Sequence, residues 1–183
     1  MGMTIQPDAK NWTWVLERDC EDCGFDIRAF PPTEIGRFIR EAAEPWPQFL
    51  AHPLARVRPD EDTWSALEYG CHVRDVYRLG LYRVNRMLSE DDPQFDNWDQ
   101  DETAVADRYD QQEPTVVADE LADAAAAFAV VYDRVGADQW GRPGLRSDGS
   151  PFTVESFGRY YLHDLMHHLV DVRHGFEVLE IGR

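Results

Sequence analysis

The sequence predicts an all-α protein, a four-helix bundle with one long crossover connection. Four stretches repeat apolar residues every three or four positions, which is typical of helices that bury one face. Loops rich in proline, glycine and acidic residues separate these stretches, and the connection over residues 89–113 is the longest. A chain of 183 residues is long enough for one domain with a sizeable core.

The first helix is expected to begin after the proline pair that precedes Thr33. Thr33 can cap it, and Glu34 suits the positive end of a helix dipole. Pro45 and Pro47 should kink or end it.

The second helix has the clearest start. Ser65 followed by Glu68 is a capping-box pattern, and apolar residues then recur at helical spacing to about Leu88. The third helix should start at Pro114, a favoured residue of the first turn, and stop at Gly136.

The fourth helix should start after Pro151, with Thr153 as its cap. We expect it to end at Gly175, which can adopt a left-handed conformation. The predicted organisation is therefore an N-terminal extension (1–32), the bundle (33–175) and a C-terminal tail (176–183).

The extension contains the motif CEDCG at residues 20–24. Cys20 and Cys23 have the spacing of a zinc knuckle or a redox pair, and the flanking segments WTWVLE and FDIRAF can form a short hairpin. A structural zinc ion needs four ligands, and no second CxxC or matching Cys and His pair follows the motif. We therefore expect an inert turn, with a second metal site and a reversible disulfide as the alternatives. Cys71 is expected to be a buried packing residue.

The charge balance excludes some partners. Thirty-five acidic and 18 basic residues give a net charge of −17, which repels nucleic acid and anionic lipid. The sequence lacks both a signal-peptide pattern and an apolar run long enough to span a membrane. Three cysteines cannot all pair in disulfides. We expect a cytoplasmic protein that acts on a small molecule.

Four of the six histidines lie in YYLHDLMHHLVDVRHG, residues 160–175. His163 and His167 are four apart on the fourth helix, so they point the same way and can bind one ion. His168 points elsewhere, and His174 lies about 16 Å from His163 along the helix. A metal site usually needs a third protein ligand, for which His72 on the second helix is the best candidate.

The segments WSALEYGCHVRDV and YLHDLMHHLVDV resemble the DinB-like superfamily of metal-binding four-helix bundles. The resemblance covers roughly residues 33–175 and implies that His72, His163 and His167 hold a divalent metal. The superfamily includes thiol-dependent transferases and mycothiol-dependent maleylpyruvate isomerases. The isomerase branch often has a carboxylate among the three ligands, whereas three histidines resemble the transferase branch. Three imidazoles favour zinc or nickel.

Three acidic residues are candidates for supporting roles, because of the direction in which they point from their helices. Asp75 and Asp171 are placed to accept a hydrogen bond from His72 and His167, respectively, and so to fix their orientation. Glu68 lies one turn before His72 and is a candidate base.

The first functional hypothesis is an enzyme in which the metal activates a low-molecular-weight thiol or water for transfer to a small electrophile. The resemblance implies mycothiol as the thiol. One alternative is a metal-dependent hydrolase, and another is a stress-associated metal-binding bundle without turnover that forms a homodimer. In the acidic crossover, Phe95, Trp98 and Tyr109 are expected to fold onto the bundle, with Trp98 above the metal.

Overall fold

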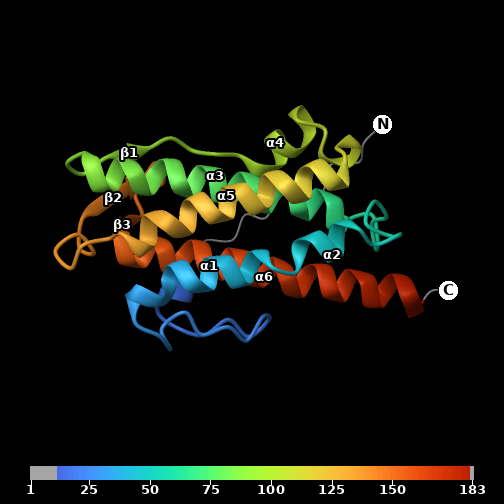
Figure 1. Cartoon of the computed structure of the whole chain (residues 1–183), viewed down its shortest axis with the longest axis horizontal. Coiled ribbons are helices and arrows are strands. Elements are labelled where there is room, and N and C mark those ends of the chain that lie inside the picture. The colour runs from blue at the N-terminus through green and yellow to red at the C-terminus, as the bar shows by residue number, and fades with distance from the viewer. Residues whose placement is uncertain (1–11, 182–183) are drawn as a thin grey trace.

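The predicted all-α class and four-helix bundle are confirmed in the computed structural model, which describes residues 12–181. Figure 1 shows the long helices running side by side along the longest axis of the molecule. The first of the four predicted helices is divided at Pro45 into a longer and a shorter segment. The bundle helices are α1 (Ile35–Ala43) with α2 (Trp46–Leu50), α3 (Ala66–Ser89), α5 (Pro114–Asp133) and α6 (Val154–Ile181).

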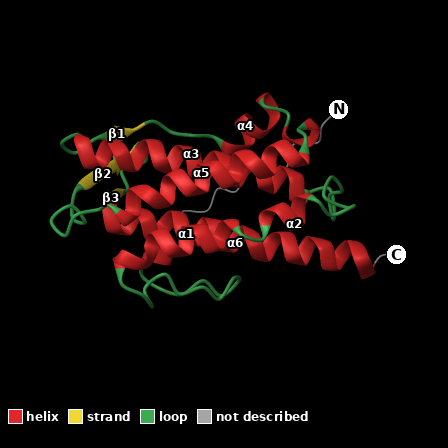
Figure 2. Cartoon of the chain, viewed as in Figure 1, coloured by secondary structure: helices red, strands yellow, loops and turns green. Residues whose placement is uncertain are grey.

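Shorter elements occupy the connections, as Figure 2 shows. Strand β1 pairs in parallel with β2, and β2 pairs antiparallel with β3, so a small sheet ties the crossover to the connection between α5 and α6. This sheet is not predicted from the sequence. The elements are η1 (Trp12–Leu16), η2 (Pro32–Glu34), β1 (Gln94–Phe95), α4 (Gln100–Ala106), η3 (Tyr109–Gln111), β2 (Pro143–Arg146) and β3 (Pro151–Thr153).

Local capping signals fix two of the helix starts. Ser65 Oγ accepts a hydrogen bond from the Glu68 amide at 3.3 Å, and the Ser65 amide donates to Glu68 Oε2 at 2.9 Å, which is the predicted capping box of α3. Thr153 Oγ1 accepts from the Ser156 amide at 3.1 Å at the start of α6. The predicted cap of the first helix is wrong, because Thr33 lies in η2 and α1 follows directly from it without a side-chain cap.

The predicted end of the fourth helix is also wrong. Helix α6 continues through Gly175 to Ile181, and Gly175 is a buried helical residue. A Cβ at Gly175 would lie 3.1 Å from Pro59 Cγ, so the glycine permits close packing of the 51–63 loop. Much of the predicted tail is therefore helix, while residues 182–183 lie outside the described part of the chain.

The N-terminal extension packs on the outside of the bundle. In Figure 1 it is the blue segment beside α1, and its η1 contacts α6. The predicted hairpin is wrong, because residues 12–31 form η1 and turns without a strand. Residues 1–11 lie outside the described residues.

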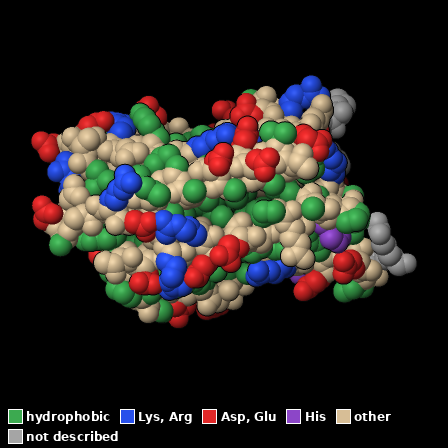
Figure 3. Space-filling model, in the orientation of Figure 1, with side chains coloured by type: hydrophobic (Ala, Val, Ile, Leu, Met, Phe, Trp, Pro, Cys, Tyr) green, Lys and Arg blue, Asp and Glu red, His purple; other side chains and the backbone are tan. Residues whose placement is uncertain are grey.

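The crossover carries many charged side chains, yet two of its aromatic residues belong to the core. Phe95 and Tyr109 are 2% and 1% exposed. Arg83 of α3 holds the crossover by donating to the Asp96 carbonyl at 2.7 Å. On the face shown in Figure 3, acidic and basic side chains are intermixed. Among residues 12–181, no helix combines the length and apolar character required to cross a membrane.

Candidate metal centre

Helix α6 carries two interleaved pairs of ligand-type side chains. One pair is His163 and His167, and the other is Asp164 and His168; each pair has the i, i+4 spacing that puts both side chains on one side of a helix. Adjacent helical residues differ by about 100° in direction, so the two pairs face different neighbours. The rotation of α6 in the bundle decides which pair meets α3.

The pair that meets α3 is Asp164 and His168. His168 Nε2 lies 3.5 Å from Asp164 Oδ1, and His72 Nε2 lies 3.7 Å from Asp164 Oδ2. The rings of His72 and His168 are 4.8 Å apart. At typical zinc distances, nitrogen and oxygen ligands of a tetrahedral ion lie about 3.4 Å apart, so three atoms in this arrangement can share one ion after small adjustments. The three side chains form one group of candidate ligands.

This grouping differs from the ligand set expected from the sequence. His72, His163 and His167 do not form a single candidate group among the described residues; His72 lies with the second pair on α6 instead. His168, which was expected to point elsewhere, is therefore a candidate ligand. The physical reason is that i, i+4 spacing occurs twice in succession here, and spacing alone does not determine how a helix is rotated.

Several atoms of this group are buried without a hydrogen-bond partner. His72 is 1% exposed, and both of its ring nitrogens lack a partner, as does Asp164 Oδ2. Buried polar atoms in native proteins are almost always satisfied, so this concentration of unpaired atoms points to a group that binds here. A divalent cation fits, because Asp164 Oδ2 and one ring nitrogen of neutral His72 can each donate a lone pair to it.

Asp171 supports this group rather than the other pair. Asp171 Oδ2 lies 2.8 Å from His168 Nδ1, the distance at which a ring N–H donates to a carboxylate. His168 Nε2 is thereby left to face Asp164 and His72. Asp171 was expected to orient His167, but its Oδ1 lies 3.7 Å from His167 Nε2, too far for a hydrogen bond.

Without a bound ion, the electrostatics of the group favour the positively charged, doubly protonated form of His168. Burial favours the neutral ring, but the carboxylates of Asp164 and Asp171 outweigh it and raise the pKa of His168 to about 10. Burial raises the pKa of Asp164, but His168 and His72 lower it well below its usual range. Burial lowers the pKa of His72, which is therefore neutral. The pocket thus already stabilises one positive charge beside a carboxylate.

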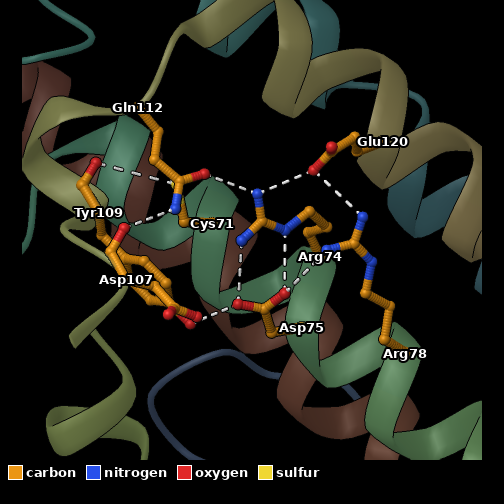
Figure 4. Close-up of polar contacts among 8 residues, drawn as sticks. All are labelled: Cys71, Arg74, Asp75, Arg78, Asp107, Tyr109, Gln112 and Glu120. Carbon is orange, nitrogen blue, oxygen red and sulfur yellow. Dashed lines mark hydrogen bonds and ion pairs between the residues drawn. The ribbon is translucent and has the colours of Figure 1, made fainter. Parts of the chain in front are cut away.

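Asp75 does not orient His72 as expected. Figure 4 shows its carboxylate turned toward Arg74 and Tyr109. Arg74 Nε and Nη2 donate to its two oxygens at 2.9 and 3.0 Å, and Tyr109 Oη donates to Oδ2 at 2.6 Å. An arginine beside it in the sequence binds this carboxylate in a bidentate geometry, so Asp75 links α3 to the crossover.

Glu68 is not placed as a base. Its side chain is 5% exposed and is bound by Arg58 Nε, 3.1 and 3.0 Å from the two oxygens, and by Ser65. Burial raises the pKa of Glu68, but the Arg58 ion pair and the Ser65 hydrogen bonds outweigh it and lower the pKa below its ordinary value. Glu68 therefore stabilises the start of α3 as a permanent anion.

The other pair on α6, His163 and His167, faces the N-terminal extension. Together with Cys20 and Cys23 it forms a second group of candidate ligands, whose ligand atoms all lie within 4.8 Å of one another. The sequence does not reveal this combination, because the candidate partners of CEDCG lie about 140 residues after the motif.

A cavity of about 550 Å³ is lined by His72, Asp164 and His168, and also by His163 and His167. Trp98 stacks on the ring of His72 at 5.5 Å and 16°, and both line the cavity. Trp98 therefore lies against a candidate ligand of the site, a position that the crossover was expected to allow. Arg83 and Tyr161 form another part of the wall and are joined by a hydrogen bond of 3.2 Å.

The two remaining histidines lie away from this site. His174 has a side chain that is 75% exposed, and His52 packs on Phe176 with ring centroids 4.3 Å apart. Cys71 is fully buried, and burial raises the pKa of its thiol to about 12, in agreement with its expected packing role.

Comparisons with known proteins place this geometry in a family. The model of the DinB superfamily matches residues 31–171. No curated protein matches the sequence. A similar solved structure is YfiT from Bacillus subtilis, described as a probable metal-dependent hydrolase with an unusual four-helix bundle topology. It has a TM-score of 0.66 and 13% identity, with 98% of this chain and 99% of that chain covered.

Proposed function

The chain belongs to the DinB superfamily, and we propose that it is a metal-dependent enzyme whose divalent ion is held by His72, Asp164 and His168. The observation that carries the proposal is the set of buried, unpaired ligand atoms beneath a cavity of about 550 Å³. Three protein ligands leave a position for water or substrate, which is typical of catalytic sites. A closed site with a fourth protein ligand would favour a structural role instead.

The ion would lower the pKa of a bound water or thiol and so supply a nucleophile near neutral pH. The chain's own residues prepare the site. Asp171 keeps a proton on His168 Nδ1, which fixes the tautomer and leaves Nε2 as the ligand atom. Trp98 covers the His72 ring and limits access of bulk water from that side.

The family resemblance is what supports thiol chemistry at this site. A set of two histidines and one carboxylate matches the pattern that the resemblance attributes to the mycothiol-dependent isomerase branch. We therefore propose transfer or addition of a low-molecular-weight thiol to a small electrophile as the reaction. Zinc and nickel suit the two imidazoles, and zinc also accepts a carboxylate in catalytic sites. Hydrolysis by bound water is the second candidate, supported by the description of YfiT.

The test is to remove and restore the metal while measuring turnover. Wild-type protein is stripped with a chelator and assayed for thiol consumption with several electrophiles and, separately, for ester and amide hydrolysis. We expect one of these activities to disappear on stripping and to return with Zn²⁺ or Ni²⁺ but not with Mg²⁺, which prefers oxygen ligands. Thiol consumption would select the first reaction and hydrolysis the second. Activity that persists in fully stripped protein would contradict metal dependence.

Asp171→Asn tests the hydrogen bond that orients His168. We expect the affinity for Zn²⁺ at the His72 site to fall by about 10–100-fold, which is typical for loss of a residue that orients a metal ligand. Asp75→Asn is the matched control, because Asp75 binds Arg74 and Tyr109 instead. Titration against a competing chelator measures both. Equal losses in the two variants would indicate a general disturbance of the fold and contradict the assignment of Asp171.

A further inference from the structure

We propose that Cys20, Cys23, His163 and His167 form a second metal site, a structural zinc site that fastens the N-terminal extension to α6. Two thiolates and two imidazoles form one of the standard closed ligand sets of structural zinc. This inference does not depend on the proposed enzymatic function, because the two groups share no ligand.

The distances agree with a single tetrahedral ion. Cys20 Sγ lies 3.7 Å from His167 Nδ1. With zinc–sulfur and zinc–nitrogen bonds of about 2.3 and 2.0–2.1 Å, tetrahedral angles place such atoms about 3.6 Å apart. All four ligand atoms lie within 4.8 Å of one another, so only small side-chain movements are needed to close the site.

The backbone of the CEDCG motif is shaped as a tight turn that presents both sulfurs to α6. The Gly24 amide donates to the Cys20 carbonyl at 2.8 Å, and Gly24 has a φ of +67°, a conformation that favours glycine. A backbone hydrogen bond from Phe25 reaches Cys23. Burial outweighs this hydrogen bond and raises the pKa of the Cys23 thiol to about 11, so the thiol keeps its proton until zinc binding displaces it.

Two of the four proposed ligands are almost completely shielded from solvent. Cys20 is 1% exposed and His163 is 4% exposed, and His163 Nε2 is buried without a hydrogen-bond partner. The ring of Trp12 packs on His163 and His167 at 5.7 and 5.2 Å. Four protein ligands, two of them buried, would complete the coordination of a zinc ion even though His163 and His167 also line the cavity, and a closed set of four is typical of a structural site rather than a catalytic one.

Zinc binding at this site requires no oxidant. Binding of Zn²⁺ displaces one proton from each cysteine thiol, and the two imidazoles bind as neutral rings. The competing reading, a disulfide between Cys20 and Cys23, requires an acceptor for two electrons and two protons. It would also leave the buried His163 Nε2 without a partner.

The site would also shape the enzyme's cavity. Trp12 packs on both histidines of the zinc site and also lines the cavity above the His72 site. The rings of His167 and His168, which belong to the two different groups, are 6.1 Å apart. Zinc bound by the extension would therefore hold Trp12 in place as one wall of the cavity.

Cobalt substitution tests the site through its sulfur ligands. Wild-type protein loaded with Co²⁺ should show thiolate-to-cobalt charge-transfer absorption, which a site of two histidines and one aspartate cannot produce. Cys20→Ser combined with Cys23→Ser should lose this absorption and one equivalent of zinc. His72→Ala is the matched control and should keep the absorption, because the His72 site contains no sulfur. Reduced wild-type protein without this absorption would overturn the proposal.

A second variant and a thiol titration guard against misfolding and oxidation. Cys23→His keeps a zinc-ligating side chain, so it should retain the zinc and show weaker charge-transfer absorption. Protein purified without reductant should release one zinc per chain when its thiols are modified, and all three cysteines should titrate as free thiols after denaturation. A single titrating thiol would identify a disulfide and overturn the proposal.

Discussion

Replacing Arg58 by methionine is expected to lower the free energy of unfolding by about 3–5 kcal/mol, the range for leaving a buried charge without its partner. The carboxylate of Glu68 is 5% exposed, and Arg58 Nε contacts both of its oxygens at 3.1 and 3.0 Å. Ser65 supplies further hydrogen bonds but no positive charge. Without Arg58 the anion would be buried at the start of α3, where it also forms the capping box.

The control is Arg56→Met, which removes an exposed ion pair with Glu113 at 3.2 Å. Exposed pairs contribute about 0–1 kcal/mol, so this variant should unfold nearly as wild type in urea at pH 7. If the two arginine variants lose the same stability, burial of Glu68 is not the cause of the loss.

The same ion pair predicts a pH dependence. The pKa of Glu68 in the folded protein lies below its ordinary value, so its contribution to stability is complete above that ordinary value, about 4.3, and is lost as the pH falls through the folded pKa. Wild type should therefore lose stability from Glu68 in acid, and Arg58→Met should lose less over the same range. Urea unfolding at a series of pH values measures the difference.

The parts of the fold that the sequence predicted are those fixed by local chemistry. The capping box at Ser65 and Glu68 sets the start of α3 because both partners lie within one turn. Pro114 sets the start of α5 in the same way. The sheet was missed because β1, β2 and β3 have two to four residues each, too few to carry an alternating pattern.

The spacing of the histidines on α6 does not by itself show which pair meets α3, because the direction in which each pair points also matters. Buried Leu162, Leu165, Leu169 and Val172 mark the side of α6 that faces the core. At about 100° per residue, the pair His163 and His167 lies about 160° from the centre of that side, and the pair Asp164 and His168 about 100°. The positions of these apolar residues therefore predict that His163 and His167 face away from the core of the bundle.

The side of α6 that bears His163 and His167 is covered by the segment that contains the CEDCG motif. A pair that faces away from the bundle should be exposed unless another segment covers it, yet His163 is 4% exposed. Its cover includes Trp12 and the cysteine-containing turn of the extension. The sequence alone does not disclose this contact, because no local pattern links residues 20–23 with residues 163–167. Only the packing of the extension brings them together.

The adjacent residues His167 and His168 give the sharpest test of whether α6 contributes to two separate metal sites. The same substitution at each residue should remove a different metal. His168→Ala removes a ligand of the His72 site, where even an orienting residue is worth about 10–100-fold in affinity. We expect more than about 100-fold weaker Zn²⁺ binding at that site and loss of turnover, while the thiolate-to-cobalt absorption persists.

His167→Ala should do the reverse and lose that absorption, because His167 lies with Cys20 and Cys23, while the ion at the His72 site remains bound. Both histidines are mostly buried, with side chains 15% and 16% exposed, so the two variants face a similar packing cost and serve as controls for each other. Elemental analysis and the cobalt spectrum on the same samples measure both sites. If His167→Ala removes the metal needed for turnover and His168→Ala leaves it in place, His72 is paired with the first set on α6 and the division into two sites is wrong.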